Sequence, residues 1–169
     1  PRGLPRRSPD WVLVMHYTSW DRSDRAKPVL LAEEGPEQLG VFSEHSAEVD
    51  GHFWRTEVSD LGASATLADG SIYRLAGRPG RDKRLEASLN GRTFTFINEN
   101  SGDWIIDDVD DEKVGQFTAR NSGVRKAILE FEHDAEGLTT AEIAGLSWFT
   151  RVILDAVSYT HLTLPTKRI

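Results

Sequence analysis

The densest group of residues able to do chemistry is an acidic run that one valine interrupts, made up of Asp107, Asp108, Asp110, Asp111 and Glu112. Hard cations such as Ca²⁺ are bound by several carboxylate oxygens close together, so these side chains are the candidate metal ligands. An EF-hand loop starting at Asp108 would need glycine at its sixth position, where this chain has Lys113. The alternative interpretation is a solvated hairpin turn between two strands.

No other motif predicts an active site or a cofactor site. The sequence has no His-Glu-x-x-His zinc motif, no Gly-x-Ser-x-Gly elbow and no Gly-x-Gly-x-x-Gly phosphate loop. His45 and His52 could meet across a bend at residues 50–51, but no third ligand accompanies them. Residues 77–81 are rich in glycine and arginine and could contact an anion, yet no helix follows to align backbone N–H groups. We therefore predict no catalytic residue and no cofactor.

Tryptophan is the other residue type that could form a binding site. Trp11, Trp54, Trp104 and Trp148 lie in apolar segments, where aromatic side chains usually belong to the core because each buries a large area. Trp20 lies among serine, aspartate and arginine in what we interpret as a polar loop. Trp20 is therefore the expected exposed contact residue.

The charge balance limits the class of partner. The 169 residues include 20 basic and 27 acidic side chains, which gives a formal net charge of −7. An acidic chain lacks the basic face that neutralises nucleic-acid phosphates, so no nucleic-acid partner is expected. The same balance disfavours simple electrostatic binding to an anionic membrane. Partners among lipids or proteins remain open.

Cysteine content and hydropathy limit the remaining classes. The chain has no cysteine, which excludes disulfides, thiolate zinc sites and a cysteine nucleophile. No apolar run reaches the ~20 residues that a transmembrane helix needs, so no transmembrane span is expected. No secretory leader is visible in residues 1–15. These features predict a cytoplasmic protein, with a peripheral position at a membrane as an extension of that prediction.

Residues 157–169 resemble a translated sequencing adapter. The run begins Val-Ser-Tyr-Thr-His-Leu and continues Thr-Leu-Pro-Thr, which matches adapter arms in one reading frame. Such a scar is not part of the natural protein and contributes nothing to its fold. We therefore expect a disordered arm at 1–10, a single C-terminally truncated barrel domain at 11–156, and a non-native tail at 157–169. Without Lys167 and Arg168 of the tail, 18 basic residues face 27 acidic ones and the formal charge is −9. The alternative is a genuine terminal strand, because Thr160, Leu162 and Leu164 alternate.

Strand patterns dominate residues 11–131. Short segments rich in β-formers recur at a spacing of about 8–12 residues, which is typical of a barrel or a sandwich. The clearest hairpin joins 85–89 to 92–97 through Asn90-Gly91, since both residues tolerate the positive φ of a type I′ turn. Asp50-Gly51 and Asp69-Gly70 mark two more turns. The expected strands are 11–15, 28–32, 39–45, 47–49, 52–58, 64–67, 71–75, 85–89, 92–97, 104–106, 114–118 and 124–131.

The pattern changes after residue 138. Thr139 and Glu142 form a capping box, and Leu138 and Ile143 occupy the positions of a hydrophobic staple. The helix that follows, residues 143–154, is apolar around nearly its whole circumference, with Arg151 as its one charge. A helix that is apolar on all sides and too short to span a bilayer is predicted to lie buried among the strands. The fold class is therefore mainly β, an antiparallel barrel of about ten or more short strands with one apolar C-terminal helix in or against it.

This arrangement resembles the tubby C-terminal-like barrels, which include the LURP-one-related proteins and the phospholipid scramblases. The resemblance covers residues 36–156 and depends on the strand pattern, on residues 107–115 leading to 124–131, and on the helix through Ser147-Trp148-Phe149. It implies a closed barrel threaded by the helix and contact with lipid, and compact bacterial members often lack an assigned activity.

Two functions are expected from these features. The first is a non-enzymatic tubby-like barrel that binds at a membrane surface or to a protein partner, with its interior filled by the helix. The alternative is a barrel that binds calcium or a small ligand, or an acid-dependent enzyme that uses His52 or the aspartates near Asp108.

Overall fold

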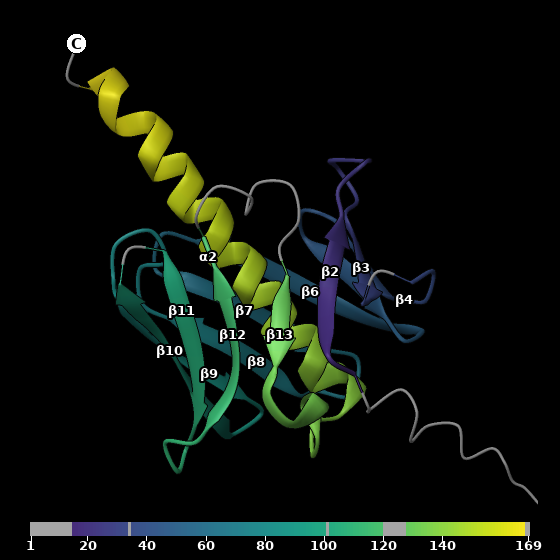
Figure 1. Ribbon diagram of the computed structural model, residues 1–169. Coiled ribbons are helices and arrows are strands. Elements are labelled where there is room, and N and C mark those ends of the chain that lie inside the picture. Colours follow the sequence, from purple (N-terminus) through teal and green to yellow (C-terminus); the bar gives the residue numbers. More distant parts are fainter. Residues whose placement is uncertain (1–14, 34, 101, 120–127, 168–169) are drawn as a thin grey trace, which may run out of the picture.

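The strands form one closed antiparallel barrel (Figure 1). The computed structural model describes residues 15–33, 35–100, 102–119 and 128–167, with side chains as far as residue 157. Each strand pairs with its neighbours in sequence, and β13 (Leu129–Phe131) pairs with β2 (Tyr17–Asp21) to close the ring. The mainly-β antiparallel barrel predicted from the sequence is confirmed. The other strands are β3 (Val29–Ala32), β4 (Gln38–Phe42), β5 (Ser46–Val49), β6 (His52–Ser59), β7 (Gly62–Leu67), β8 (Ile72–Ala76), β9 (Arg84–Leu89), β10 (Arg92–Asn100), β11 (Asp103–Asp108) and β12 (Lys113–Thr118).

Two hairpin turns have the predicted geometry. Asn90 and Gly91 have φ values of 56° and 96°, and the flanking Leu89 and Arg92 pair directly. At the turn between β5 and β6, Asp50 and Gly51 have φ values of 52° and 80°. Positive φ at both central residues matches the right-handed twist of the strands, which is why Asx-Gly pairs occur there.

The connections divide between two ends of the barrel, because successive strands alternate in direction. The lower end, where helix α2 (Thr140–Lys167) begins at the lower right of Figure 1, carries residues 33, 35–37, 50–51, 68–71, 90–91, 109–112 and 132–139. The upper end carries residues 22–28, 43–45, 60–61, 77–83 and 102.

Helix α2 (Thr140–Lys167) begins at the lower end and passes through the barrel to the upper end (Figure 1). The capping box is confirmed: the Glu142 N–H donates to Thr139 Oγ1 at 3.1 Å, and the Thr139 N–H donates to Glu142 Oε1 at 3.0 Å. Leu138 and Ile143 are both buried, as a hydrophobic staple requires. Residues 157–167 continue the helix, so the terminal strand of the alternative interpretation is wrong.

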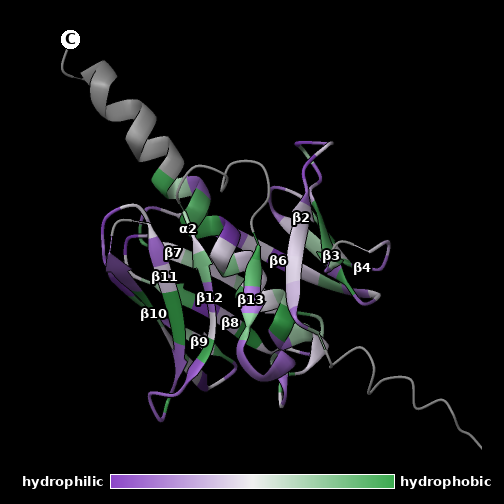
Figure 2. Cartoon of the chain, in the orientation of Figure 1, coloured by the Kyte–Doolittle hydropathy of each residue, from purple (hydrophilic) through white to green (hydrophobic). Residues whose placement is uncertain are grey.

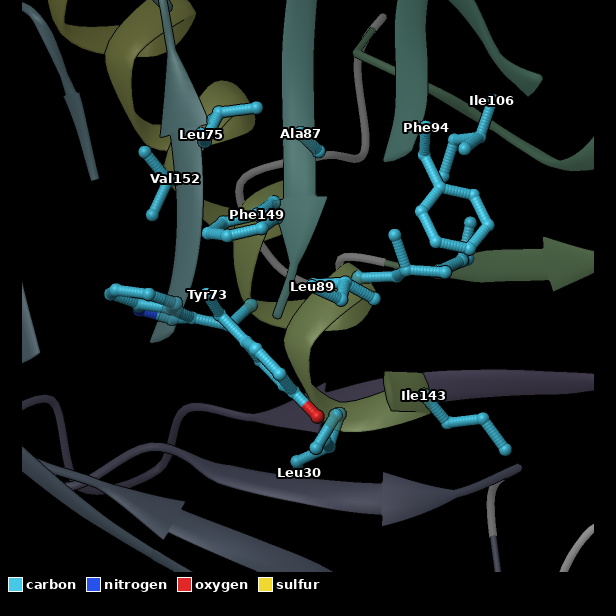
Figure 3. Close-up of a cluster of buried hydrophobic side chains, with 14 of the residues drawn as sticks. Leu30, Tyr73, Leu75, Ala87, Leu89, Phe94, Ile106, Ile143, Phe149 and Val152 are labelled. Carbon is cyan, nitrogen blue, oxygen red and sulfur yellow. The ribbon is translucent and has the colours of Figure 1, made fainter. Parts of the chain in front are cut away.

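The helix is the centre of the hydrophobic core. Every residue from 143 to 150 is buried, which confirms a helix surrounded by strands. Figure 3 shows Phe149 and Val152 of α2 beside Leu75 of β8 and Ala87 of β9. Figure 2 shows several hydrophobic segments on the part of α2 inside the barrel and mostly hydrophilic residues at the strand connections. Gly145 permits the close approach of α2 to β8, because a Cβ there would lie 2.8 Å from Cδ2 of Tyr73.

The first and last predicted strands lie partly outside the described residues. The arm at 1–10 and most of the strand expected at 11–15 are not described, although Met15 is buried. Of the strand expected at 124–131, only β13 is described. Strand β2 was not predicted, because its residues were interpreted as a polar loop.

Candidate functional site

The acidic run forms the turn between β11 and β12. Asp108 Oδ1 accepts hydrogen bonds from the N–H groups of Asp110 at 2.8 Å and Glu112 at 2.9 Å. Asp111 has a φ of 63°, which Asn and Asp tolerate better than other side chains. The Asp108 carboxylate therefore satisfies backbone donors within the turn, as aspartate commonly does at such positions.

The side chains of the acidic run are not drawn together into a group of metal ligands in the described part of the chain. Within the described ranges, which include all five candidate residues, no three or more acidic or histidine side chains are grouped so that they could hold a metal ion. Burial raises the pKa of Asp107, and the nearby carboxylates of Asp111 and Asp108 raise it further. The geometry agrees with the turn interpretation and gives no support to Asp107, Asp108, Asp110, Asp111 and Glu112 as cation ligands.

Trp20 was predicted to be an exposed contact residue, and this prediction is wrong. Its side chain is 2% exposed, and its Nε1–H donates to the Ser147 carbonyl of α2 at 3.3 Å. Two polar neighbours that precede Trp20 are themselves buried: Thr18 is fully buried, and the Ser19 hydroxyl donates to the Glu33 carbonyl at 2.6 Å. Ser147 Oγ donates to the Ile143 carbonyl at 2.8 Å, so Thr18 is the donor of the 2.7 Å bond between the Thr18 and Ser147 hydroxyls.

The histidine pair considered from the sequence does not form. His45 precedes β5 at the upper end of the barrel, and His52 begins β6 at the lower end. His45 Nε2 instead lies 3.6 Å from a carboxylate oxygen of its neighbour Glu44. The two imidazoles therefore lie at opposite ends of the barrel, because strand β5 runs between His45 and the turn at 50–51.

A charged cluster lies where α2 reaches the upper end. Arg22, just after β2, places Nη2 3.0 Å from Asp155 Oδ1 of α2. Arg151, one turn before Asp155, places Nε 3.9 Å from its other oxygen. The Arg151 guanidinium stacks over the Trp20 ring with its carbon 4.4 Å from the centroid, and it lies 5.7 Å from the centroid of Phe42. The ring of Trp20 therefore packs against the Arg151 guanidinium and is not exposed for contact with another molecule.

Burial controls the electrostatics of this cluster. The Arg151 side chain is 13% exposed. Desolvation lowers its pKa to about 10, Asp155 opposes that shift, and Arg22 adds to it. The sequence offered one indication of this site, since Arg151 is the single charge in an otherwise apolar helical stretch. The sequence gave no indication of Arg22, because Arg22 and Asp155 are far apart in the chain and only the closed barrel brings them together.

Charge is distributed unevenly between the two ends. The described connections of the lower end contain no lysine or arginine, and their acids are Glu33, Glu37, Asp50, Asp69, Asp110, Asp111, Glu112, Glu132, Asp134 and Glu136. The described connections of the upper end contain Arg22, Arg25, Lys27, Arg78, Arg81 and Lys83 against Asp24, Glu44, Asp60 and Asp82. The overall negative charge therefore belongs mainly to the lower end.

Each end also exposes apolar side chains at a turn. At the upper end Leu61 is 65% exposed and Val58 is 56% exposed, and both line a hollow of about 540 Å³. At the lower end Val109 is 74% exposed at the tip of the acidic turn. Exposed apolar groups beside basic connections occur at the upper end, whereas Val109 stands among acids.

Comparison with known proteins gives no relative. No protein-family model, no curated protein and no solved structure matches this chain. Among the helices in the described part of the chain, none has the length and apolar character required to cross a bilayer.

Proposed function

We propose that this protein is a non-enzymatic tubby-like barrel that docks its upper end on the anionic surface of a cytoplasmic membrane leaflet. The observation that carries the proposal is the separation of charge between the two ends of the barrel. The closed barrel around one buried helix is the architecture that the tubby resemblance implies, and it supports the proposal.

The net negative charge of the whole chain is compatible with such docking. Strand β6 has 8 residues, which at ~3.3 Å per residue and a typical barrel tilt separates the two ends by about 20 Å. The Debye length is about 8 Å at physiological ionic strength, so a surface touching the upper end hardly senses the lower one. The charge that matters is therefore that of the nearer connections.

The upper end combines the two features that peripheral binding uses. Arg78, Arg81 and Lys83 are exposed in one connection and would face anionic headgroups. Each basic residue near such a surface contributes about 1 kcal/mol. Leu61, at the tip of the neighbouring turn between β6 and β7, offers an exposed apolar side chain for insertion.

Vesicle co-sedimentation tests the proposal. The purified protein should bind phosphatidylserine vesicles more strongly than phosphatidylcholine vesicles, and binding should fall as salt rises. Exchanging Arg81 and Lys83 for glutamate should weaken binding at least tenfold, because two attractions of about 1 kcal/mol each become repulsions. Leu61→Asp should weaken it too, whereas the matched control Val109→Asp at the other end should not.

Two results would contradict the proposal. One is equal binding to both kinds of vesicle, and the other is an equal effect of Leu61→Asp and Val109→Asp. The alternative of a calcium-binding or small-ligand barrel draws no support from the described residues, since the helix fills the interior and the acidic run forms a turn.

A further inference from the structure

Two guanidinium groups at the upper end share a single carboxylate. Asp155 contacts Arg22 at 3.0 Å and Arg151 at 3.9 Å, using a different oxygen for each. The cluster therefore carries two positive charges against one negative charge. The Arg151 contact is at the outer limit of an ion pair, so Asp155 neutralises Arg22 better than it neutralises Arg151.

Each of these guanidinium groups has one buried nitrogen that lacks a hydrogen-bond partner among the described residues. The Nη1 atoms of Arg22 and Arg151 are buried, and neither has a hydrogen-bond partner among the described residues. Each Nη1 carries two N–H donors, and buried donors in folded proteins are nearly always bonded. Stacking on Trp20 offsets part of the cost for Arg151 but does not satisfy N–H groups in the guanidinium plane.

We infer that Arg22 and Arg151 form a binding site for a phosphate group. A bound oxyanion would accept hydrogen bonds from the two Nη1 atoms and would offset the excess positive charge. Guanidinium is the side chain best suited to such recognition, because its donors match the spacing of phosphate oxygens. The two Nη1 atoms together offer four N–H donors, a number that suits a tetrahedral oxyanion. Asp155 already supplies the carboxylate that contacts both arginines, so a second carboxylate is not needed there.

The position of the cluster gives a ligand a route to it. The Arg22 side chain is 28% exposed and Asp155 is 46% exposed, so the site lies just below the surface of the upper end. Arg151 is held by the buried helix and by Trp20, which makes it the fixed half of the site. Arg22 follows β2 in a connection and is the more exposed of the two arginines, at 28% against 13% for Arg151.

Titration with inorganic phosphate in phosphate-free buffer tests the inference without any membrane. The wild-type protein should bind phosphate more tightly than acetate. Arg151→Met and Arg22→Met should each weaken binding about tenfold or more, as expected for loss of a charge-assisted hydrogen bond. Arg25→Met, which removes an exposed arginine from the same connection, should change the affinity by less than about twofold.

Asp155→Asn is the most discriminating variant, because it is expected to increase the affinity for phosphate. Removing the competing carboxylate should tighten phosphate binding by about tenfold, in line with the strength of a charge-assisted bond. Partial unfolding cannot produce tighter binding, so this variant remains informative even if an arginine variant folds poorly. Unchanged or weaker binding by Asp155→Asn would overturn the inference, as would a wild type that does not bind phosphate.

Vesicles identify the source of the phosphate group. Phosphatidic acid presents a phosphomonoester, and phosphatidylglycerol presents a diester at similar surface charge. A preference for phosphatidic acid vesicles that Arg151→Met abolishes would show that the ligand is a lipid headgroup. Equal binding to the two kinds of vesicle, by a protein that still binds inorganic phosphate, would indicate a soluble phosphate ligand. Vesicle binding by a protein that binds no inorganic phosphate would refute this inference alone and leave the proposed docking surface standing.

Discussion

Replacing Trp148 with alanine should destabilise the protein by about 4 kcal/mol. The side chain is 2% exposed, and its ring stacks with Phe42 at 6.1 Å and lies 5.4 Å from the ring of Phe149. A buried tryptophan removes ~150–250 Å² from water, which corresponds to about 4–6 kcal/mol at ~25 cal/mol per Å². Alanine retains part of that burial, and measured losses for large aromatic residues replaced by alanine are about 3–5 kcal/mol.

Urea denaturation followed by circular dichroism measures this loss. With a slope of about 2 kcal/mol per molar urea, the midpoint should fall by about 2 M. Trp148→Phe, which keeps a ring at the same place, should lose less than Trp148→Ala. Val109→Ala, at an exposed turn, should stay within ~0.5 kcal/mol of wild type. A Trp148→Ala midpoint equal to that of wild type would show that α2 does not fill the barrel.

Two further predictions concern buried polar groups. Thr18→Val removes the donor to the Ser147 hydroxyl inside the barrel and should cost about 1–2 kcal/mol in the same denaturation assay. In combination with Ser147→Ala its cost should be less than additive, and full additivity would show that the two hydroxyls are not coupled. Asp107→Asn should raise the melting temperature at pH 7, because the raised pKa of Asp107 means that the fold disfavours its charged form. The gain should vanish at acidic pH, where the carboxyl is protonated in both folded and unfolded chains, and a gain that persists there would contradict the electrostatic explanation.

Features encoded locally could be predicted from the sequence. The Asn90-Gly91 turn depends on the positive φ of two adjacent residues, and the capping box depends on Thr139 and Glu142 three positions apart. The buried helix was also predictable, because apolar residues around its whole circumference leave no face for water. Each of these features is encoded in one continuous segment of the chain.

Strand β2 could not be recognised in this way. Thr18 and Ser19 look solvated in the sequence, yet both are buried in the fold. The hydroxyl of Thr18 bonds to that of Ser147, which lies 129 positions further along the chain. Burial of a polar side chain is favourable only when the fold supplies a hydrogen-bond partner for it. The burial of Thr18, and of Trp20 in the same strand, therefore depends on tertiary packing.

The closed barrel also decides where this protein can bind a partner. Closure of β13 onto β2 leaves the described strands without a free edge, so strand addition is not available as a binding mode. The helix fills the interior, which leaves the two ends and the outer face for recognition. The ends differ in charge because their connections differ in composition, and α2 adds Arg151 to the upper end from inside the barrel. A fixed guanidinium held on Trp20 beside a second one at Arg22 is therefore a consequence of threading the helix, and it gives the upper end a specificity for phosphate that exposed basic connections alone would lack.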